Sequence, residues 1–478
     1  MSISPSDSLS AQLATFIVNT RFDSLPAAVL PMIRNAFTDC LGVGLAARNE
    51  AVVAAVARTA ATLSAHGAAR LLFIGSSTTS AGAAALINGT AAHALDYDDA
   101  ALDAHPSAVL VSALLACAQE SETPGSELVT AFAVGYEVWA ELYSRLKQPM
   151  YVHGFHPTGI MGSVAAAAAL ANLLRLDSLQ TAHALGLAAS FAGGLVANFG
   201  SMAKPVHAGR AAENGVIAVR MALAGITASE ASLEHPQGFL SSYAGQRNVE
   251  LKSPVACGRT WRLLQYGLSI KLFPVCYGVH RALHALSELL TKHPVKASAV
   301  RTIAVEIGRS QLIPLSQHEP LNARQARFST EFAMASMLMT RECGLAQLQD
   351  SVVAAPDMQA LMRKVEITPL DAQDAEEPVF SPYDRVTLHL RDGGLLESAA
   401  VTRPPGHLSI PVTPEQLWAK FSDCLAGVEG LSAPELFDAL QRLDQLPTIT
   451  RLPVLQLPDS LYVDEVVGSF KPAARDPS

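Results

Sequence analysis

From about residue 8 to residue 265, apolar residues recur three and four positions apart, and glycines and prolines separate the runs. This spacing places apolar side chains on one face of a helix, so it predicts a series of helices. Alanine, the strongest helix former, is abundant in these runs. The clearest expected helices span residues 6–20, 26–46, 80–96, 107–118 and 157–177.

The pattern changes after about residue 298, where apolar and polar residues alternate in several short segments. Such alternation is typical of half-buried strands, in which successive side chains point to opposite faces of a sheet. Asp392, Gly393 and Gly394 interrupt one of these segments and predict a hairpin turn. The expected strands lie within 298–308, 364–370 and 384–402, with a helix at 329–341 among them.

Helical periodicity returns after Pro411, in residues 413–427 and 433–446. We therefore expect a mainly α protein, with a large all-helical domain formed from both chain ends and a smaller inserted α+β domain. The expected boundaries are 1–268 for the first helical part, 269–405 for the α+β domain and 406–478 for the second helical part. The last residues, 470–478, are expected to be disordered, as chain ends often are.

Composition supports more than one domain, because 478 residues exceed what one hydrophobic core usually spans. Half of the residues are hydrophobic and 16% are charged, which favours large buried interfaces and a homo-oligomer. The net charge of −9 and the lack of a long Lys/Arg run argue against nucleic-acid binding.

The six cysteines show no CxxC spacing, which favours reduced, buried thiols over disulfides or a metal site. The first residues have no basic stretch before their apolar run, and the Ala-rich windows near 163–175 and 183–199 are too short or too glycine-broken to span a bilayer. We expect a soluble, cytoplasmic protein without a membrane partner.

The segment LDYDDAALDAHPSA, residues 95–108, gathers ionisable side chains before an apolar helix pattern. Asp96, Asp98 and Asp99 precede His105, and a carboxylate can fix the tautomer of a histidine and raise its basicity. The pattern therefore predicts a general acid or base, with Asp96 and His105 as the pair. Helix capping and a turn are the alternative explanation for these aspartates.

The segment GFHPTG, residues 154–159, follows Tyr151 and His153 and includes His156 and Thr158. A histidine at a helix entrance can place an imidazole against a substrate carboxylate, assisted by the free N–H groups of the first turn. A packing or capping histidine explains the segment nearly as well. His153 is expected to be structural or exposed.

In GSMAKPVHAGRAAENG, residues 200–215, Lys204, His207 and Arg210 recur every three residues. If Pro205 opens a helix, these side chains lie near one face and suit a substrate with several carboxylates. Arg210 can bind a carboxylate through two N–H groups, and Lys204 can act as a point charge or base. The alternative is a solvated basic helix face.

SIKLFPVCYGVHRALHAL, residues 269–286, contributes Lys271, Cys276, Tyr277 and His280. Lys271 falls near the expected domain junction, where ligand clefts are common. Cys276 has apolar neighbours in the sequence and no evident histidine partner, so we do not expect it to act as a nucleophile.

The sequence contains no GxGxxG motif followed by a strand, no Walker motif, no HExxH and no GxSxG. Cofactor-free acid/base chemistry without a metal is what remains.

Four ordered motifs, LDYDDAxxxxHPSA, GFHPTG, NFGSMAKPVHAGRAAENGV and KLFPVCYGVHRA, resemble the MmgE/PrpD family over almost the whole chain. That family includes 2-methylcitrate dehydratase, cis-aconitate decarboxylase and iminodisuccinate epimerase. The resemblance implies a large helical domain, a smaller α+β lid, a homodimer and a cofactor-independent active site between the domains.

Matched against cis-aconitate decarboxylase, the resemblance places the active-site residues at positions that share the family motifs. Ala100 stands where that enzyme has a threonine, and the lid sequence near 312–329 lacks a clear counterpart of its tyrosine. In the epimerase, a tyrosine and a lysine are proposed to face the reacting carbon, and they correspond to Tyr151 and Lys204. The matched catalytic positions are Asp96, His105, His156, Lys204 and Lys271.

The working hypothesis is a hydro-lyase that dehydrates a 2-methylcitrate-like di- or tricarboxylate. Asp96 would orient His105, and Lys204 or His105 would move the proton. Alternatives are an epimerase that uses Tyr151 and Lys204, a cis-aconitate decarboxylase, or a catalytically idle polycarboxylate-binding homologue. The residues expected to hold carboxylates are His156, His207, Arg210 and Lys271.

Overall fold

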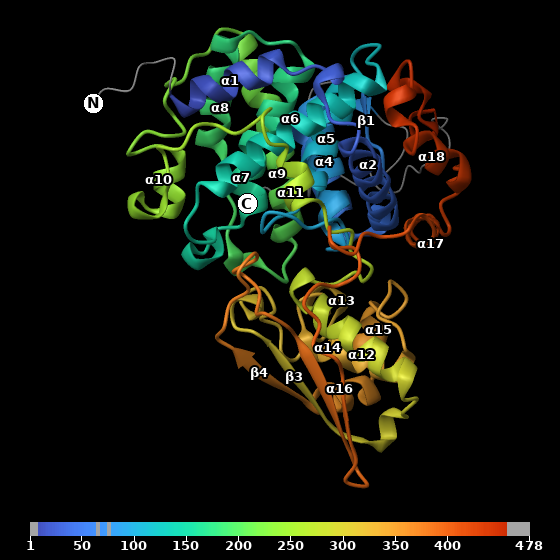
Figure 1. Ribbon diagram of the computed structural model, residues 1–478. Coiled ribbons are helices and arrows are strands. Elements are labelled where there is room, and N and C mark those ends of the chain that lie inside the picture. The colour runs from blue at the N-terminus through green and yellow to red at the C-terminus, as the bar shows by residue number, and fades with distance from the viewer. Residues whose placement is uncertain (1–7, 64–66, 74–77, 457–478) are drawn as a thin grey trace, which may run out of the picture.

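A computed structural model describes residues 8–63, 67–73 and 78–456 of the chain. Figure 1 shows a large helical body above a smaller part that contains a β-sheet. The expected mainly α architecture is confirmed. Residues 470–478, predicted to be disordered, lie outside the described residues.

The centre of the helical body is a set of helices that are buried on all sides. Every residue of α5 (Pro106–Ala118) and α7 (Pro157–Leu173) is buried, in keeping with sequences that are apolar all round. They pack with α4 (Ala81–Ala94), α6 (Gly125–Ser144) and α9 (Ala203–Leu223). Around them lie α1 (Leu9–Asn19), α2 (Val29–Ala46), α3 (Ala51–Leu63), α8 (Ser178–Phe191), α10 (Phe239–Ala244) and α11 (Arg262–Tyr266).

The contact between α4 and α9 is unusually close, because glycines meet there. A Cβ atom at Gly209 would collide with the carbonyl oxygen of Leu86 and the hydroxyl of Thr90, and Gly89 lies directly opposite. Small residues therefore let the two backbones touch. This contact fixes the start of α9 beside the end of α4, where two of the predicted site residues lie.

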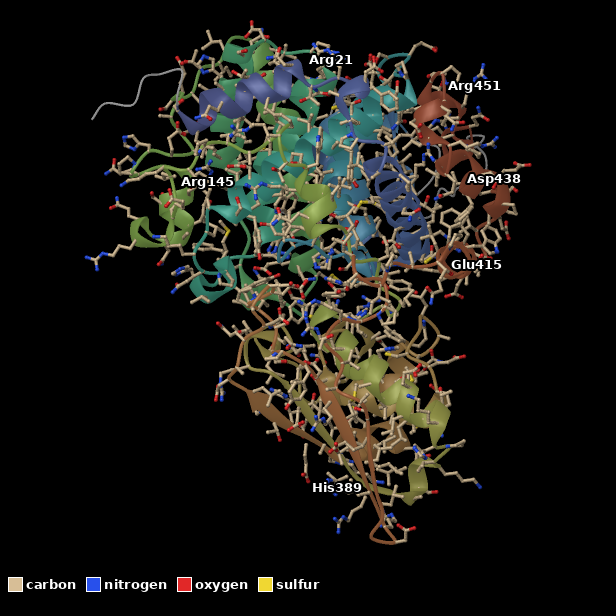
Figure 2. All side chains as sticks on the ribbon, in the orientation of Figure 1. Arg21, Arg145, His389, Glu415, Asp438 and Arg451 are labelled. Carbon is tan, nitrogen blue, oxygen red and sulfur yellow. The ribbon has the colours of Figure 1, made fainter. Side chains whose placement is uncertain are left out.

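The last described helices, α17 (Pro414–Cys424) and α18 (Ala433–Leu440), pack against α2. In α17, Leu417, Phe421 and Cys424 are buried at helical spacing. Glu415 and Asp438 lie on the outer side of these helices, facing away from the body (Figure 2). Residues near both ends of the chain thus share one hydrophobic core.

A second hydrophobic core lies in the part of the molecule that contains the main sheet. The strand order is β4–β3–β5–β6, with β3 and β4 parallel and the other pairs antiparallel. Gly393, with φ +88°, turns the chain between the last two strands, so the predicted hairpin is confirmed. The strands are β3 (Val300–Gly308), β4 (Val365–Leu370), β5 (Arg385–Leu390) and β6 (Leu395–Glu397).

Helices α12 (His280–Lys292) and α14 (Thr330–Thr340) pack against this sheet and against each other. The helix expected at residues 329–341 corresponds to α14. Shorter helices complete this part, and a small two-stranded sheet lies in the helical body. Their bounds are α13 (Ala323–Ala326), α15 (Asp350–Val353), α16 (Pro356–Met362), β1 (Ala69–Arg70) and β2 (Thr78–Thr79).

Within the described residues, no helix taken singly has the length and apolar character needed to cross a bilayer. One pair, Val29–Asn49 with Ala51–Leu63, meets that test when taken together, and it is bent by 87°.

Candidate active site

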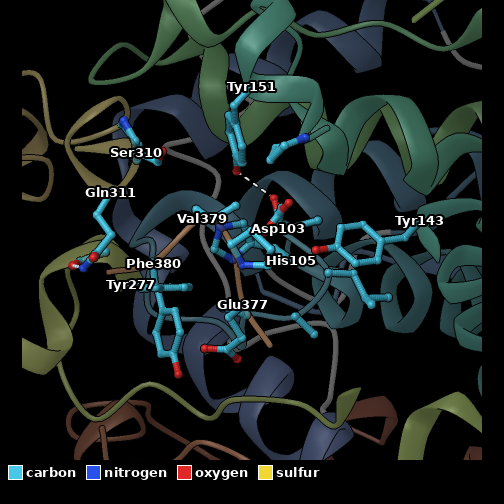
Figure 3. Close-up of a pocket in the computed structure, with 18 of the residues that line it drawn as sticks. Asp103, His105, Tyr143, Tyr151, Tyr277, Ser310, Gln311, Glu377, Val379 and Phe380 are labelled. Atoms are coloured by element: carbon cyan, nitrogen blue, oxygen red, sulfur yellow. Dashed lines mark hydrogen bonds between the residues drawn. The ribbon is translucent and has the colours of Figure 1, made fainter. Parts of the chain in front are cut away.

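A cavity of about 370 Å³ is lined by residues from both the helical body and the sheet-containing part. Figure 3 shows the polar side chains that converge on it. Of the predicted site residues, Asp96, His105, Tyr151 and Lys204 line the cavity wall. They come from the end of α4, the start of α5, the short helix η4 (Met150–His153) and the start of α9.

Asp96 is the centre of a buried cluster of charges. Its carboxylate accepts hydrogen bonds from Lys204 and, at 3.1 Å, from Lys271, whose Nζ also lies 2.7 Å from the Asp96 carbonyl oxygen. Burial alone would raise the pKa of Asp96, but the two ammonium groups hold it well below its ordinary value. One carboxylate with two lysines leaves a net positive charge, which suits an anionic substrate.

Lys204 lies in the first turn of α9 and has aromatic rings around it. Its Nζ is 5.1 Å from the ring centre of Phe199 and 4.9 Å from that of Phe328. The rings exclude water from the ammonium group, and their faces attract it. Lys271 does not line the cavity; it lies fully buried behind Asp96.

His105 is held at the entrance of α5 by backbone contacts. Its Nδ1 lies 2.9 Å from the carbonyl oxygen of Asp99, and because a carbonyl can only accept, Nδ1 carries the hydrogen. Burial, Lys271 and other nearby cations hold the pKa of His105 well below its usual 6.5. The neutral ring then has its lone pair on Nε2, which makes no hydrogen bond to any described residue.

Asp96 was expected to orient His105, and the geometry does not support that role. Nε2 of His105 lies 3.8 Å from Asp96 Oδ1, beyond hydrogen-bond distance, because the two lysines occupy the carboxylate. The carbonyl of Asp99 orients the ring instead.

The other two aspartates of this segment have structural partners. Asp98 accepts from Nδ1 of His93 at 3.0 Å, and Asp99 accepts from Ser107 at the first turn of α5. Helix capping therefore explains Asp99, and burial raises its pKa to about 8. His93, Asp98 and His105 lie close enough to share a cation, but the ammonium groups of the Asp96 cluster oppose one.

Tyr151 and His156 lie next to one another beside this cluster. Tyr151 lines the cavity and donates to the carbonyl oxygen of Asp103 at 2.7 Å, and burial raises its pKa well above 10. His156 precedes the first turn of α7 and lies behind the wall, with its ring 4.9 Å from that of Phe199. Its Nδ1 lies 3.1 Å from Nδ1 of His207, and burial holds its pKa well below 6.5.

The structure does not place Arg210, a predicted substrate-binding residue, at this cavity. Arg210 is exposed on α9, pairs with Glu213 at 2.5 Å and does not line the cavity. Each three-residue step on a helix turns about 60° backwards, so Arg210 lies about 120° from Lys204. His207, one step away, also lies outside the cavity wall and contacts His156 instead.

Several cavity residues were not predicted from the sequence. Tyr143 and Glu377 come from a buried helix and a loop near the sheet, and Asp103 lies in the quoted segment 95–108 but was not singled out there. Tyr277 and Cys276 do belong to a quoted motif. Burial raises the pKa of Cys276 to about 11, so its thiol is protonated at neutral pH, which agrees with the prediction that it is not a nucleophile.

Comparison with known proteins identifies relatives over most of the chain. The MmgE/PrpD N-terminal domain matches residues 11–252, and the MmgE/PrpD C-terminal domain matches residues 273–443. Cis-aconitate decarboxylase of Homo sapiens is 30% identical over 355 residues, which cover 71% of each chain. That of Mus musculus is 29% identical, covering 77% of this chain and 78% of its own.

A fungal relative, cis-aconitate decarboxylase of Aspergillus terreus (strain NIH 2624 / FGSC A1156), is 27% identical over 399 residues, or 78% of this chain and 80% of its own. These relatives are enzymes, and their names describe lyases. The two domain matches together include Asp96 and Lys204, and they show that the chain belongs to the MmgE/PrpD family.

Proposed function

We propose that the protein is a lyase that removes water from a 2-methylcitrate-like di- or tricarboxylate by taking a proton from a carbon next to a carboxylate. The observation that supports this reaction is the state of His105. It is neutral, its Nδ1 is fixed by a backbone carbonyl, and its Nε2 has no partner among the described residues. These are the properties of a general base.

In this proposal Lys204 binds the substrate carboxylate next to the reacting carbon. Proton loss shifts negative charge onto that carboxylate, and the positive cluster of Lys204, Lys271 and Asp96 stabilises it. Such preorganised groups act most strongly where charge develops, and loss of one donor typically costs about 10²–10³ in rate. His156 and His207 position the wall behind Lys204.

Decarboxylation of cis-aconitate is the second candidate, because relatives with that name cover most of the chain. Carbon dioxide loss requires a group that delivers a proton to carbon. A neutral His105 is better suited to accept one, although a bound polyanion would raise its pKa. Ala100 lines the cavity where the family resemblance places a threonine in cis-aconitate decarboxylase, and this difference counts against decarboxylation.

Epimerisation is a third candidate, supported by Tyr151 and Lys204 on the wall of the same cavity.

We further propose that residues 269–405 act as a lid over the cavity, that the protein acts as a homodimer and that it needs no cofactor. A lid is supported by Tyr277, Gln311 and Glu377, which line the cavity from that range.

Proton NMR of the purified protein with 2-methylcitrate, citrate, cis-aconitate and iminodisuccinate, each in deuterated buffer, tests the proposal. A new olefinic proton from citrate, or replacement of the methyl doublet of 2-methylcitrate by a downfield methyl singlet, supports dehydration. Loss of a carboxylate from cis-aconitate alone, or deuterium exchange without elimination, would replace it with the second or third candidate. Lys204→Ala and His105→Ala proteins that are folded but convert substrate at the wild-type rate would refute the residue roles.

A further inference from the structure

The chain turns back sharply at residues 101–104, directly before His105. Ala101 and Ala104 exchange two backbone hydrogen bonds, of 3.0 and 2.8 Å, and Leu102 and Asp103 between them have φ of +55° and +57°. A left-handed conformation is unfavourable for leucine, so the surrounding structure must hold it. Such strain gathers at functional sites.

Contacts on both sides hold this turn. Ala100 exchanges backbone hydrogen bonds with Ser269, at 3.0 and 2.9 Å, and the Tyr151 hydroxyl donates to the carbonyl oxygen of Asp103. The amide of His105 donates to Thr158 at 3.2 Å. Asp103 and His105 are therefore presented to the same cavity by one rigid segment, and Figure 3 shows both side chains there.

The carboxyl group of Asp103 differs from the other carboxyl groups on the cavity wall. Asp96 has two lysines, Glu377 contacts Arg281 and His407 at 3.0 and 2.9 Å, and the exposed Glu376 lies 3.3 Å from Arg403. Among the described residues, no cation pairs with Asp103. Its Oδ2 is buried and has no hydrogen-bond partner.

The groups that face Asp103 leave its proton affinity high. Burial raises the pKa of Asp103 to about 7. A hydrogen bond between its carboxyl group and the Tyr143 hydroxyl from α6 works against this increase, and the negative charge of Glu377 from the sheet-containing part adds to it. His105 and Tyr151 are its other titratable neighbours on the turn and on η4, and both are uncharged at neutral pH. The pKa of Asp103 is therefore raised and that of His105, two residues away, is lowered. Opposite pKa shifts in neighbouring groups are typical of a catalytic acid and base.

We propose that Asp103 is the general acid that protonates the departing hydroxyl group of the substrate. This inference rests on the proposed dehydration. Nε2 of His105 takes the proton from carbon, the electrons of that bond form the double bond, and the C–O bond breaks with its electrons going to oxygen. The carboxyl proton of Asp103 passes to that oxygen, so water leaves. The imidazolium and the carboxylate then return to their starting states by net proton transfer from His105 to Asp103.

Substrate binding favours the protonated form of this acid. A polycarboxylate brings negative charge near an unpaired carboxyl group, which raises its pKa further. Asp103 therefore takes up a proton when an anion binds at a pH above 7. This uptake requires no turnover and can be measured with propane-1,2,3-tricarboxylate, which has no hydroxyl group to lose.

Asp103→Asn is the decisive variant, because asparagine accepts the left-handed conformation and keeps the shape of the side chain while losing the acid. With 2-methylcitrate, we expect kcat to fall about 10²–10⁴-fold. With an analogue that carries fluorine in place of the hydroxyl group, the loss should be less than about tenfold, since fluoride needs no proton to leave. Asp371→Asn, a change of an exposed carboxylate paired with Arg309, is the matched control.

A purely structural role for Asp103 predicts equal losses with both leaving groups, and that result would overturn the proposal. Calorimetry of propane-1,2,3-tricarboxylate binding at pH 8, in buffers of different ionisation enthalpy, gives a second test. We expect close to one proton taken up by the wild type and by Asp371→Asn, and markedly less by Asp103→Asn. Equal uptake in all three refutes the role of Asp103, whether or not the protein dehydrates a hydroxy acid.

Discussion

The buried cluster of Asp96, Lys204 and Lys271 gives a prediction about stability that depends on which of its charges is removed. Asp96→Asn leaves two ammonium groups facing each other without a carboxylate. Each close contact in this cluster is worth roughly 4 kcal/mol at an effective dielectric constant of about 20, before the cost of desolvation. Removing the partner of buried charges costs about 3–5 kcal/mol in net terms, and we expect that loss here.

Lys271→Met should behave differently. It leaves the neutral pair of Asp96 and Lys204, and the methionine fills the fully buried space of the lysine chain without an ammonium group to desolvate. We expect a change of about 1 kcal/mol or less in the free energy of unfolding. The double variant should be more stable than Asp96→Asn alone by about 2 kcal/mol, because the remaining lysine no longer faces a second one.

Urea unfolding followed by tryptophan fluorescence measures these differences, since Trp139, Trp261 and Trp418 all lie in the helical body. Because the folded-state pKa of Asp96 lies below its ordinary value, its stabilisation is full above about pH 4 and is lost only as the pH falls through the lowered pKa. The difference between wild type and Asp96→Asn should therefore be constant from pH 6 to 8. This electrostatic account would be refuted if Asp96→Asn and Lys271→Met lowered the free energy of unfolding equally and the double variant showed the sum of the two losses.

Three further variants or treatments test other parts of the structure. Arg210→Gln should leave KM for 2-methylcitrate unchanged in steady-state assays, because Arg210 pairs with Glu213 on the surface. A tenfold rise in KM would show instead that Arg210 contributes to substrate binding. Iodoacetamide at pH 8, followed by mass spectrometry, should leave Cys276 unmodified in the folded protein, since its pKa is about 11. Lys420→Met should lower the free energy of unfolding by about 3–5 kcal/mol, because it strips the buried Asp39 of the ammonium group 2.5 Å away; an unchanged urea midpoint would contradict this.

Much of the fold could be predicted because its elements have strong local patterns. The all-apolar runs form α5 and α7 where the sequence indicated, although α7 ends at Leu173 and not at residue 177, and the hairpin turn at Gly393 was also predicted. The site residues from the quoted motifs also converge, since Asp96, His105, Tyr151 and Lys204 meet at one cavity.

The features of the site that could not be predicted depend on contacts between segments that are distant in the sequence. Arg210 was misplaced because a spacing of three residues drifts around a helix, and only the packing of α9 decides which face is buried. The orientation of His105 by the Asp99 carbonyl could not be predicted, because backbone atoms leave no sequence signal. Asp103 was missed because its importance lies in what its carboxyl group lacks, a cation, and that is visible only in three dimensions.

The most direct test of the account compares wild type and His105→Gln in the conversion of 2-methylcitrate, with the proton signal of the methyl group as readout. Glutamine keeps a polar side chain of similar reach but offers no basic nitrogen. We predict that the wild type converts the methyl doublet of 2-methylcitrate into a downfield methyl singlet, and that this rate is lower by about 10²–10⁴ in a variant with an unchanged urea midpoint. An unchanged rate in the variant, or carbon dioxide released from cis-aconitate with no olefin formed from 2-methylcitrate, would contradict the account.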